Sequence, residues 1–276
     1  MKKIFALLMI CSLILLTGCG AEKISDGQEI RLGMITRLNI SERLLDDYIE
    51  SVYSKANPNS DIPVHKHIFF DNMNSMIAAL HAGQIDEMST YRSVADYLIA
   101  RNDSFELRHL YAPKITDEFC CAVRAEDTAL KKEFDDAILK LKLDGTLARL
   151  TKTYIINTDE EPPAVDMPRF DGATTIKVAV TGDLPPLDYV TADGKPAGFN
   201  TALLSAISKI IGKNFELVQV DSGARTAALS SKQVDVIFWV TVPLDETIVP
   251  QNLDKPDDAI VTEPYFTDEV AHVKIY

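Results

Sequence analysis

The sequence has few of the features that mark a nucleic-acid-binding protein, a metalloprotein or a hydrolase. Its 276 residues include 28 Lys and Arg against 41 Asp and Glu, a formal charge of −13. An excess of acid argues against nucleic acid and against a basic membrane-surface patch. There is no Gly-rich phosphate loop, nucleophile elbow or zinc motif, and no low-complexity tract. We therefore expect no cofactor, no metal and no catalytic residue.

Cysteine is also scarce, and its spacing excludes a disulfide framework. Cys11 lies in the N-terminal apolar segment and Cys19 follows it, which leaves the neighbours Cys120 and Cys121. Adjacent cysteines rarely bridge because the small ring strains the peptide between them. In EFCCAV they alternate between the faces of an expected strand, so we interpret them as small buried hydrophobic residues. A vicinal redox or metal site is the alternative.

The first residues have the pattern of an export signal. Lys2 and Lys3 precede an apolar run that ends at Leu16 and is short for a bilayer span. The following Thr17-Gly18-Cys19 completes a sequence that resembles the lipobox of bacterial lipoproteins. That resemblance implies a signal peptide over 1–18, acylation (palmitate) at Cys19 and anchoring outside the cytoplasmic membrane, or a periplasmic location. An ordinary secretory leader or an uncleaved anchor is the alternative.

The C-terminal half predicts an α/β unit with a parallel sheet. Between Ile176 and Trp239 the pattern gives strand, Pro-stiffened loop, helix, strand, short helix and strand. In such sheets small ligands bind beyond the carboxyl ends of the strands. We therefore expect the loops 181–187 and 239–243 to form one wall of a site.

The N-terminal half repeats part of this pattern. Ala78-Ala79-Leu80 followed by Gln84-Ile85-Asp86 reappears 149 residues later as Ala227-Ala228-Leu229 followed by Gln233-Val234-Asp235. In both places a helix ends in a polar turn and leads into a strand that carries an acidic residue. Two lobes of similar build are the interpretation.

Periodicity places the remaining elements. A helix is expected to start at the N-cap Asn39, with Glu42 in capping-box register. Residues 156–175 are rich in acidic residues and prolines and show no apolar periodicity, so we predict that they form a linker. The other expected strands are 29–35, 64–70, 85–89, 105–111, EFCCAV and the closing EVAHVKIY; the other expected helices are 73–81, 91–101, 128–141 and 145–154.

Several stretches resemble the family 3 extracellular solute-binding proteins, the amino-acid receptors of ABC importers. KVAVTGDLPPLDYVTADGKPAGFNTALLSAISKIIG, AALSSKQVDVIF and TEPYFTDEVAHV are similar to the family's first lobe. SMIAALHAGQIDEMSTYRSVADYLI is similar to its second lobe, and FCCAVRAEDTALKKEFDDAILKLKLDGTLARL to its return strand and C-terminal helices. The Pro185-Pro186 step, Gly198-Phe199 and the run from Glu263 to Phe266 are the most specific parts.

The resemblance implies an α/β, two-lobed, periplasmic-binding-protein-like fold of type 2. Each lobe would be a mostly parallel sheet flanked by helices, with two crossover strands between them. The lobes stand in reversed order, which circular permutation explains; fusion of two half-modules is the alternative. The expected segments are the signal peptide 1–18, tether 19–28, second-lobe-like domain 29–115, crossover strand and helices 116–155, linker 156–175, and first-lobe-like domain with the final crossover strand 176–276.

Receptors of this family work by closing two lobes around a solute. The resemblance therefore implies a non-enzymatic, monomeric, lipid-anchored protein. It would capture a small polar solute, an amino acid or related metabolite, for an ABC importer permease. Two alternatives stay open: a degenerate sensory or scaffolding module, and a dehydratase or lyase that uses Asp183 or Glu246.

The family's ionic contacts to an α-amino acid are poorly matched. WVTVPLDET stands where the family has its carboxylate-binding arginine, and Tyr91 stands where an acid binds the amine. A family aspartate and an aromatic residue correspond to Thr181 and Leu184. Asp183 and Asp188 are interpreted as turn residues rather than an acid–base pair. His65 and His67 share a strand face, with no obvious third metal ligand.

Other residues would take over the contacts. A helix N-terminus at 36–41 suits an anionic group, and Arg37 or Arg92 would hold one. Tyr91 and Trp239 would stack on a flat or apolar solute. For Arg92 a solvated role, and for Tyr91 and Trp239 a packing role, are the alternatives. The expected ligand-binding residues are Thr36, Arg37, Asn39, Ser41, Thr90, Tyr91, Arg92, Thr181, Leu184, Trp239 and Thr241.

Overall fold

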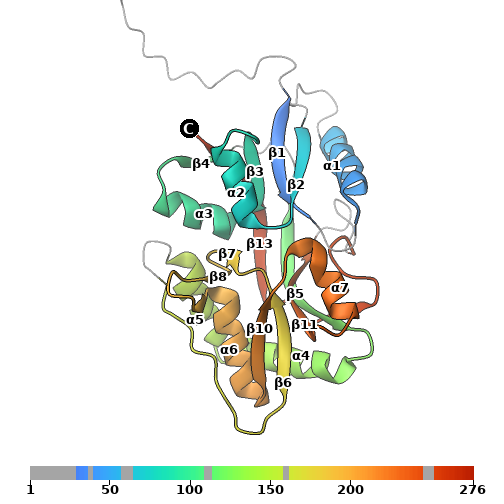
Figure 1. Cartoon of the computed structure of the whole chain (residues 1–276), viewed down its shortest axis with the longest axis vertical. Helices are drawn as coiled ribbons and strands as arrows, with labels where there is room; N and C mark the ends of the chain where they lie inside the picture. The colour runs from blue at the N-terminus through green and yellow to red at the C-terminus, as the bar shows by residue number, and fades with distance from the viewer. Residues whose placement is uncertain (1–28, 37–39, 57–64, 109–113, 158–161, 245–251) are drawn as a thin grey trace, which may run out of the picture.

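The structure is a computed structural model that describes residues 29–36, 40–56, 65–108, 114–157, 162–244 and 252–276. Two α/β lobes lie one above the other in Figure 1. Strands β5 (Thr116–Arg124) and β13 (Phe266–Ile275) run along the middle of the molecule between them. None of the helices in the described ranges combines the length and apolar composition needed to cross a bilayer.

The N-terminal lobe is built on three parallel strands. β1 (Ile30–Ile35) lies between β2 (His65–Phe70) and β3 (Glu87–Tyr91) and is parallel to both. The helices of this lobe are α1 (Glu42–Ala56), α2 (Met73–His81) and α3 (Arg92–Arg101). In α2, Asn72 caps the N-terminus by accepting from Ser75 N, and the apolar stripe of the helix is buried.

The C-terminal lobe repeats this arrangement. β6 (Thr175–Val180) lies between β10 (Asn214–Gln219) and β11 (Val236–Pro243) and is parallel to both. Its helical segments are α4 (Thr128–Leu143), α5 (Thr146–Thr151) with the π-helical turn η1 (Lys152–Ile156), α6 (Phe199–Ile211), the 3-10 turn η2 (Ser222–Ala224) and α7 (Arg225–Ser230). A separate small sheet holds β7 (Asp183–Leu184), β8 (Asp188–Val190) and β9 (Pro196–Ala197).

β13 joins the sheets of the two lobes. Its residues 266–269 pair with β5, and its residues 270–275 pair with β3 and with β4 (Phe105–Arg108). The strand order is β10-β6-β11-β5-β13-β3-β1-β2, with β12 (Ala259–Val261) also on β5. The expected two-lobed α/β fold is confirmed, with the antiparallel strands β5 and β13 at its centre.

Some element boundaries differ from those predicted. The expected loop 239–243 is part of β11, because antiparallel pairing with β5 continues to Pro243 after a register shift at Trp239. Tyr91, expected to open a helix, ends β3, whose start is two residues later than predicted because the turn before it extends through Asp86. Helix α1 begins at Glu42, and the predicted cap Asn39 lies outside the described residues.

The described part of the predicted linker, 156–157 and 162–175, contains no helix or strand except at its two ends, where Ile156 closes η1 and Thr175 opens β6. It is nevertheless fixed to the C-terminal lobe. Ser205 Oγ donates to the carbonyl of Asp166, and Asn214 exchanges two hydrogen bonds with the backbone of Phe170. Polar side chains of the lobe thus hold a segment that lacks ladder hydrogen bonds of its own.

Cys120 and Cys121 are buried on opposite faces of β5, in two different apolar clusters. Burial raises the pKa of the Cys120 thiol to about 12, and burial likewise raises the pKa of the Cys121 thiol well above its ordinary value. Both side chains are therefore neutral at physiological pH. A thiolate is the form that binds metal or attacks a disulfide, so these thiols are poorly suited to either role.

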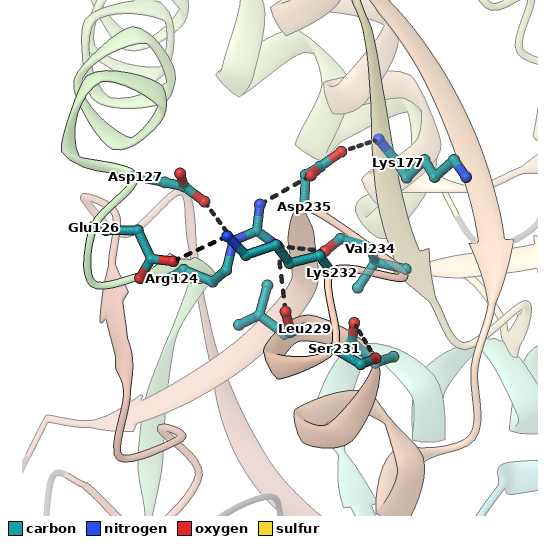
Figure 2. Close-up of polar contacts among 10 residues, drawn as sticks. Arg124, Glu126, Asp127, Lys177, Leu229, Ser231, Lys232, Val234 and Asp235 are labelled. Atoms are coloured by element: carbon teal, nitrogen blue, oxygen red, sulfur yellow. Dashed lines mark hydrogen bonds and ion pairs between the residues drawn. The ribbon is translucent and has the colours of Figure 1, made fainter.

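The internal repeat has a structural cause. Asp86 N donates to the carbonyl of Arg31, and Arg31 N donates to the Asp86 carboxylate at 2.8 Å. In the second copy Asp235 makes the same two bonds with Lys177, at 2.8 and 3.0 Å. Figure 2 shows Asp235 also facing Arg124, whose guanidinium reaches Asp127 and the carbonyls of Leu229 and Val234. In each lobe the aspartate ties the turn after a helix, α2 or α7, to the first parallel strand, β1 or β6.

The turn before each aspartate yields a stability prediction. Gly83 has φ +66°, and the equivalent residue 149 positions later, Lys232, has φ +62°. A residue with a Cβ is disfavoured in this conformation, so Lys232→Gly is expected to raise the free energy of unfolding by about 0.5–1 kcal/mol. The substitution removes little other stabilisation, because the ion pair between Lys232 and Glu126 is exposed and its N–O distance is long, at 3.7 Å. Urea denaturation measures the change; Gly83→Lys is the matched variant and should destabilise, whereas a loss of stability in Lys232→Gly would contradict the assignment.

Candidate functional site

A cavity of about 50 Å³ lies between the two lobes. The N-terminal lobe contributes Met34, Ile35, Thr36, Asp71, Asn72, Met73, Ser89, Thr90 and Tyr91. The C-terminal lobe contributes Thr181, Asp183, Leu184, Ser222, Arg225, Trp239 and Asp254, and β13 contributes Val270.

The topology explains this set. Residues 34–36, 71–73 and 89–91 stand at or just after the carboxyl ends of β1, β2 and β3. Residues 181–184 and 222–225 follow β6 and β10 in the same way, and residue 239 lies within β11, just after the part of that strand, 236–237, that pairs in parallel with β6. In both lobes the carboxyl edge of the parallel strands therefore faces the cavity, as expected for ligand sites in open α/β sheets.

Asp183 is one bridge between the lobes. Its carboxylate accepts a hydrogen bond from Asn74 N, at the N-terminus of α2 in the other lobe, at 2.9 Å. Ser222 N donates to the carbonyl of Asp71 at 3.0 Å, which forms a second bridge. Burial raises the pKa of Asp183, and the backbone hydrogen bonds oppose that shift. The lobes are thus held together by their own polar groups in this conformation.

Asp188 organises the loop that carries Asp183. It is 1% exposed and accepts from Thr181 Oγ1 at 2.6 Å, Gly182 N at 2.5 Å and Asn200 Nδ2 at 3.2 Å. Burial raises the pKa of Asp188, while these hydrogen bonds and the charge of Arg225 act in the opposite direction. Asp188 is the first residue of β8 rather than a turn residue, and it fixes the preceding residues Thr181 and Gly182 through these bonds.

Arg225 is a buried cation in the wall of the cavity. Its side chain is 1% exposed, although it opens a short helix, α7. It donates to the carbonyl of Trp239 and to Ser222 Oγ, both at 2.9 Å. An arginine held in this way has a fixed fork of donors and suits a carboxylate on a solute.

An aromatic cluster closes the bottom of the cleft where the lobes meet. Phe119 of β5 lies 4.7 Å from Tyr91 and 5.1 Å from Trp239 between ring centroids. The Tyr91 hydroxyl donates to Asp117 at 2.6 Å. These rings come from β3, β5 and β11, so they join the apolar cores of the two lobes.

The charges that line the cavity are unequal. Asp71, Asp183 and Asp254 face one cation, Arg225. Asp254 is 2% exposed and accepts from both Thr241 N and Thr241 Oγ1, at 3.0 and 3.1 Å. This excess of carboxylate favours a solute with no net negative charge.

The structure brings six of the predicted binding residues together. Those that line the cavity are Thr36, Thr90, Tyr91, Thr181, Leu184 and Trp239. Thr241 lines a neighbouring apolar cavity of about 80 Å³ under α1. Ser41 Oγ accepts from Leu44 N at the start of α1, and Arg92 is half-exposed and paired with Asp96, so neither lines the cavity. Arg37 and Asn39 lie outside the described residues, as does Glu246.

Sequence reasoning missed Asp71, Asn72, Ser222, Arg225 and Asp254. Asp71 and Asn72 follow β2, and Ser222 and Arg225 follow β10. The rule used for the other strands, that ligands sit beyond their carboxyl ends, would have found them. Asp254 could not be found in this way, because it does not follow a predicted strand and is not part of the internal repeat.

The histidines of β2 lie away from this cavity. His67 contacts Asp46 of α1, and the ring of His65 lies 6.2 Å from that of His67 and 6.3 Å from that of His272. Burial lowers the pKa of His65 to about 4, so it is neutral at physiological pH. Within the described residues, no three His, Cys, Asp or Glu side chains are grouped so as to hold a metal ion.

Comparison with known proteins identifies the C-terminal lobe. Residues 176–243 match the model of the bacterial extracellular solute-binding proteins, family 3. The amino-acid-binding protein AabA of Dichelobacter nodosus is 51% identical over 41 residues, which are 15% of this chain and 16% of that protein. Over residues 176–243 the resemblance to family 3 is confirmed.

Two solved structures are similar to this chain at much lower sequence identity. The ligand-binding component of an ABC-type import system from Staphylococcus aureus, with zinc bound, is 12% identical, with a TM-score of 0.45 over 90% of this chain and 66% of that one. A nutrient-binding protein from Burkholderia cenocepacia bound to methionine is 13% identical, with a TM-score of 0.41 over 89% of this chain and 84% of that one. Both TM-scores are below 0.5, so the two-lobed assignment rests on the strand order of this chain.

Proposed function

We propose that this chain, a family 3 extracellular solute-binding protein by its residues 176–243, captures a small polar solute between its two lobes by closing them. The observation that carries the proposal is the cavity between the lobes, lined by polar side chains from both. A solute there touches a complete set of groups only when the lobes are closed. Its affinity therefore favours the closed conformation.

The solute class we propose is an amino acid or a related zwitterionic metabolite. Arg225 would hold its carboxylate, and the aspartates of the cavity would stabilise its amine. The binding residues proposed are those of the predicted set that line the cavity, together with Arg225 and Asp183. Asp183 is here a bridge between lobes rather than a catalytic acid, because its carboxylate already accepts from the N-terminus of α2.

We further propose that the protein is a monomer anchored at the outer face of the cytoplasmic membrane by lipid on Cys19, and that it delivers solute to an ABC importer permease. The lipobox-like residues 16–19 support the anchor, and membership of family 3 supports the transporter. The reversed lobe order is proposed to be a circular permutation through 156–175. The permutation is supported by the position of the lobe that matches family 3: it resembles the family's first lobe but comes second in this chain.

Isothermal titration of the purified chain with each of the twenty standard amino acids tests the function. At least one should bind with a micromolar or lower dissociation constant. Small-angle scattering should then show a smaller radius of gyration with that amino acid than without it, as expected for closure. Absence of heat with every amino acid, and of any change in scattering, would contradict the proposal and favour the sensory or scaffolding alternative.

A further inference from the structure

Trp239 is the single tryptophan of the chain, and its indole N–H has an unusual environment. The side chain is 5% exposed and lines the cavity between the lobes. Its Nε1 is buried and has no hydrogen-bond acceptor among the described residues. A buried donor without an acceptor costs about 1–3 kcal/mol, and the great majority of buried donors have a partner.

The faces of the indole ring, in contrast, are already in contact with the protein. The Arg225 guanidinium carbon lies over the ring, 5.4 Å from its centroid. Phe119 packs against it at 5.1 Å with a tilt of 42°, and Tyr91 meets it edge-on at 6.0 Å and 84°. Little of the ring face is left for a solute to stack on, so what Trp239 offers is its N–H.

Two acceptors in the wall of the cavity already serve other donors. The carbonyl of Trp239 accepts from Arg225, and the carboxylate of Asp254 accepts from Thr241 N and Oγ1. Neither accepts from the indole N–H. A solute in the adjoining cavity that carries an acceptor would give the indole N–H the hydrogen bond that the protein does not supply.

We propose that Trp239 determines which solutes the cleft retains, by donating its indole N–H to a carbonyl or carboxylate oxygen of the solute. This rests on the proposed solute-binding function. The solute carries no net negative charge, because the cavity wall already holds three aspartates against one arginine. A solute without such an oxygen leaves the N–H buried and unpaired, and is discriminated against for that reason.

The proposal is tested with a variant that removes the indole N–H and keeps the shape of the side chain. Trp239→3-benzothienylalanine keeps the two fused rings and their contacts but lacks the donor. Each of the twenty standard amino acids is titrated calorimetrically into the unmodified chain and the variant. We expect every amino acid that binds the unmodified chain to bind the variant about tenfold more weakly, the value of one hydrogen bond of about 1.4 kcal/mol. Equal affinities for all of them would overturn the proposal.

A second measurement reports on the same atom directly. In ¹⁵N-labelled protein the single tryptophan gives one indole N–H resonance, which should move downfield when a bound amino acid accepts its hydrogen bond. A resonance that does not move, at saturation with an amino acid that binds by calorimetry, would also overturn the proposal.

The two proposals fail in different ways. If no amino acid binds the unmodified chain, the function is wrong, and the unliganded proteins still test the inference. An unpaired buried donor makes the variant at least as thermally stable as the unmodified chain, whereas a fall in its melting temperature would show that the N–H has a partner inside the protein. That fall would overturn the role given to Trp239.

Discussion

Arg225→Met is expected to lower the free energy of unfolding by about 2–4 kcal/mol, because it leaves two buried acceptors without their charged donor. Arg225 is 1% exposed and donates to the Trp239 carbonyl and to Ser222 Oγ. Methionine fills a similar volume but leaves both acceptors buried without this donor. It also removes the positive charge that favours the ionised form of Asp188.

Urea denaturation followed by circular dichroism measures this change. Arg92→Met is the matched control, because Arg92 is half-exposed and its ion pair with Asp96 joins adjacent turns of α3. Exposed pairs of this kind contribute little, so the control should change stability by no more than about 0.5 kcal/mol. A loss of less than 1 kcal/mol in Arg225→Met would show that the guanidinium is solvated, and would remove it from the proposed site.

Gly198→Ala is expected to destabilise the protein by about 3 kcal/mol or more, because it combines backbone strain with a clash. Gly198 has φ +102°, and a Cβ there would lie 2.4 Å from the Leu187 carbonyl oxygen and 2.7 Å from that of Pro186. Those two carbonyls accept from Phe199 N and Asn200 N at the start of α6. The close approach therefore fixes the loop that carries Asp183 and Leu184 to the helix.

Gly194→Ala separates the two causes of this effect. Gly194 has φ +79°, but a Cβ there would meet nothing within 4 Å, so only backbone strain of about 1–2 kcal/mol applies. Thermal denaturation of both variants should give a clearly larger fall in melting temperature for Gly198→Ala. Similar falls would show that the loop moves away from the helix, and that the contact does not hold the cavity wall in place.

Much of the fold was predictable because local patterns and tertiary contacts agree. The helix at 73–81 has a cap, an apolar stripe and a Gly turn, and it forms over the predicted residues. The repeated Asp86 and Asp235 were visible as a spacing, and in both lobes the aspartate binds the first parallel strand. Gly198-Phe199, singled out by the resemblance alone, has a steric cause in the structure.

The errors have a common origin in long-range pairing. Residues 239–243 were predicted as a loop because a ligand site was expected beyond the end of the strand at Trp239, although Val240, Thr241 and Val242 favour a strand. The strand continues because β5, more than a hundred residues earlier in the chain, supplies hydrogen-bond partners as far as Pro243. Tyr91 ends a strand for a similar reason, since it pairs with Val270 of β13.

The α/β class, the two parallel units and the edge of each where a ligand would bind could all be predicted, because they follow from periodicity and from the order of strands and helices. Which side chains share the cavity depends instead on how distant segments pack together. Arg225 and Asp254 are polar residues without a local pattern, and their burial depends on contacts with distant segments. The same holds for Asp183, whose partner at the N-terminus of α2 is 109 residues away in the chain. Local propensity does not encode such contacts, because their free energy arises only when the two lobes meet.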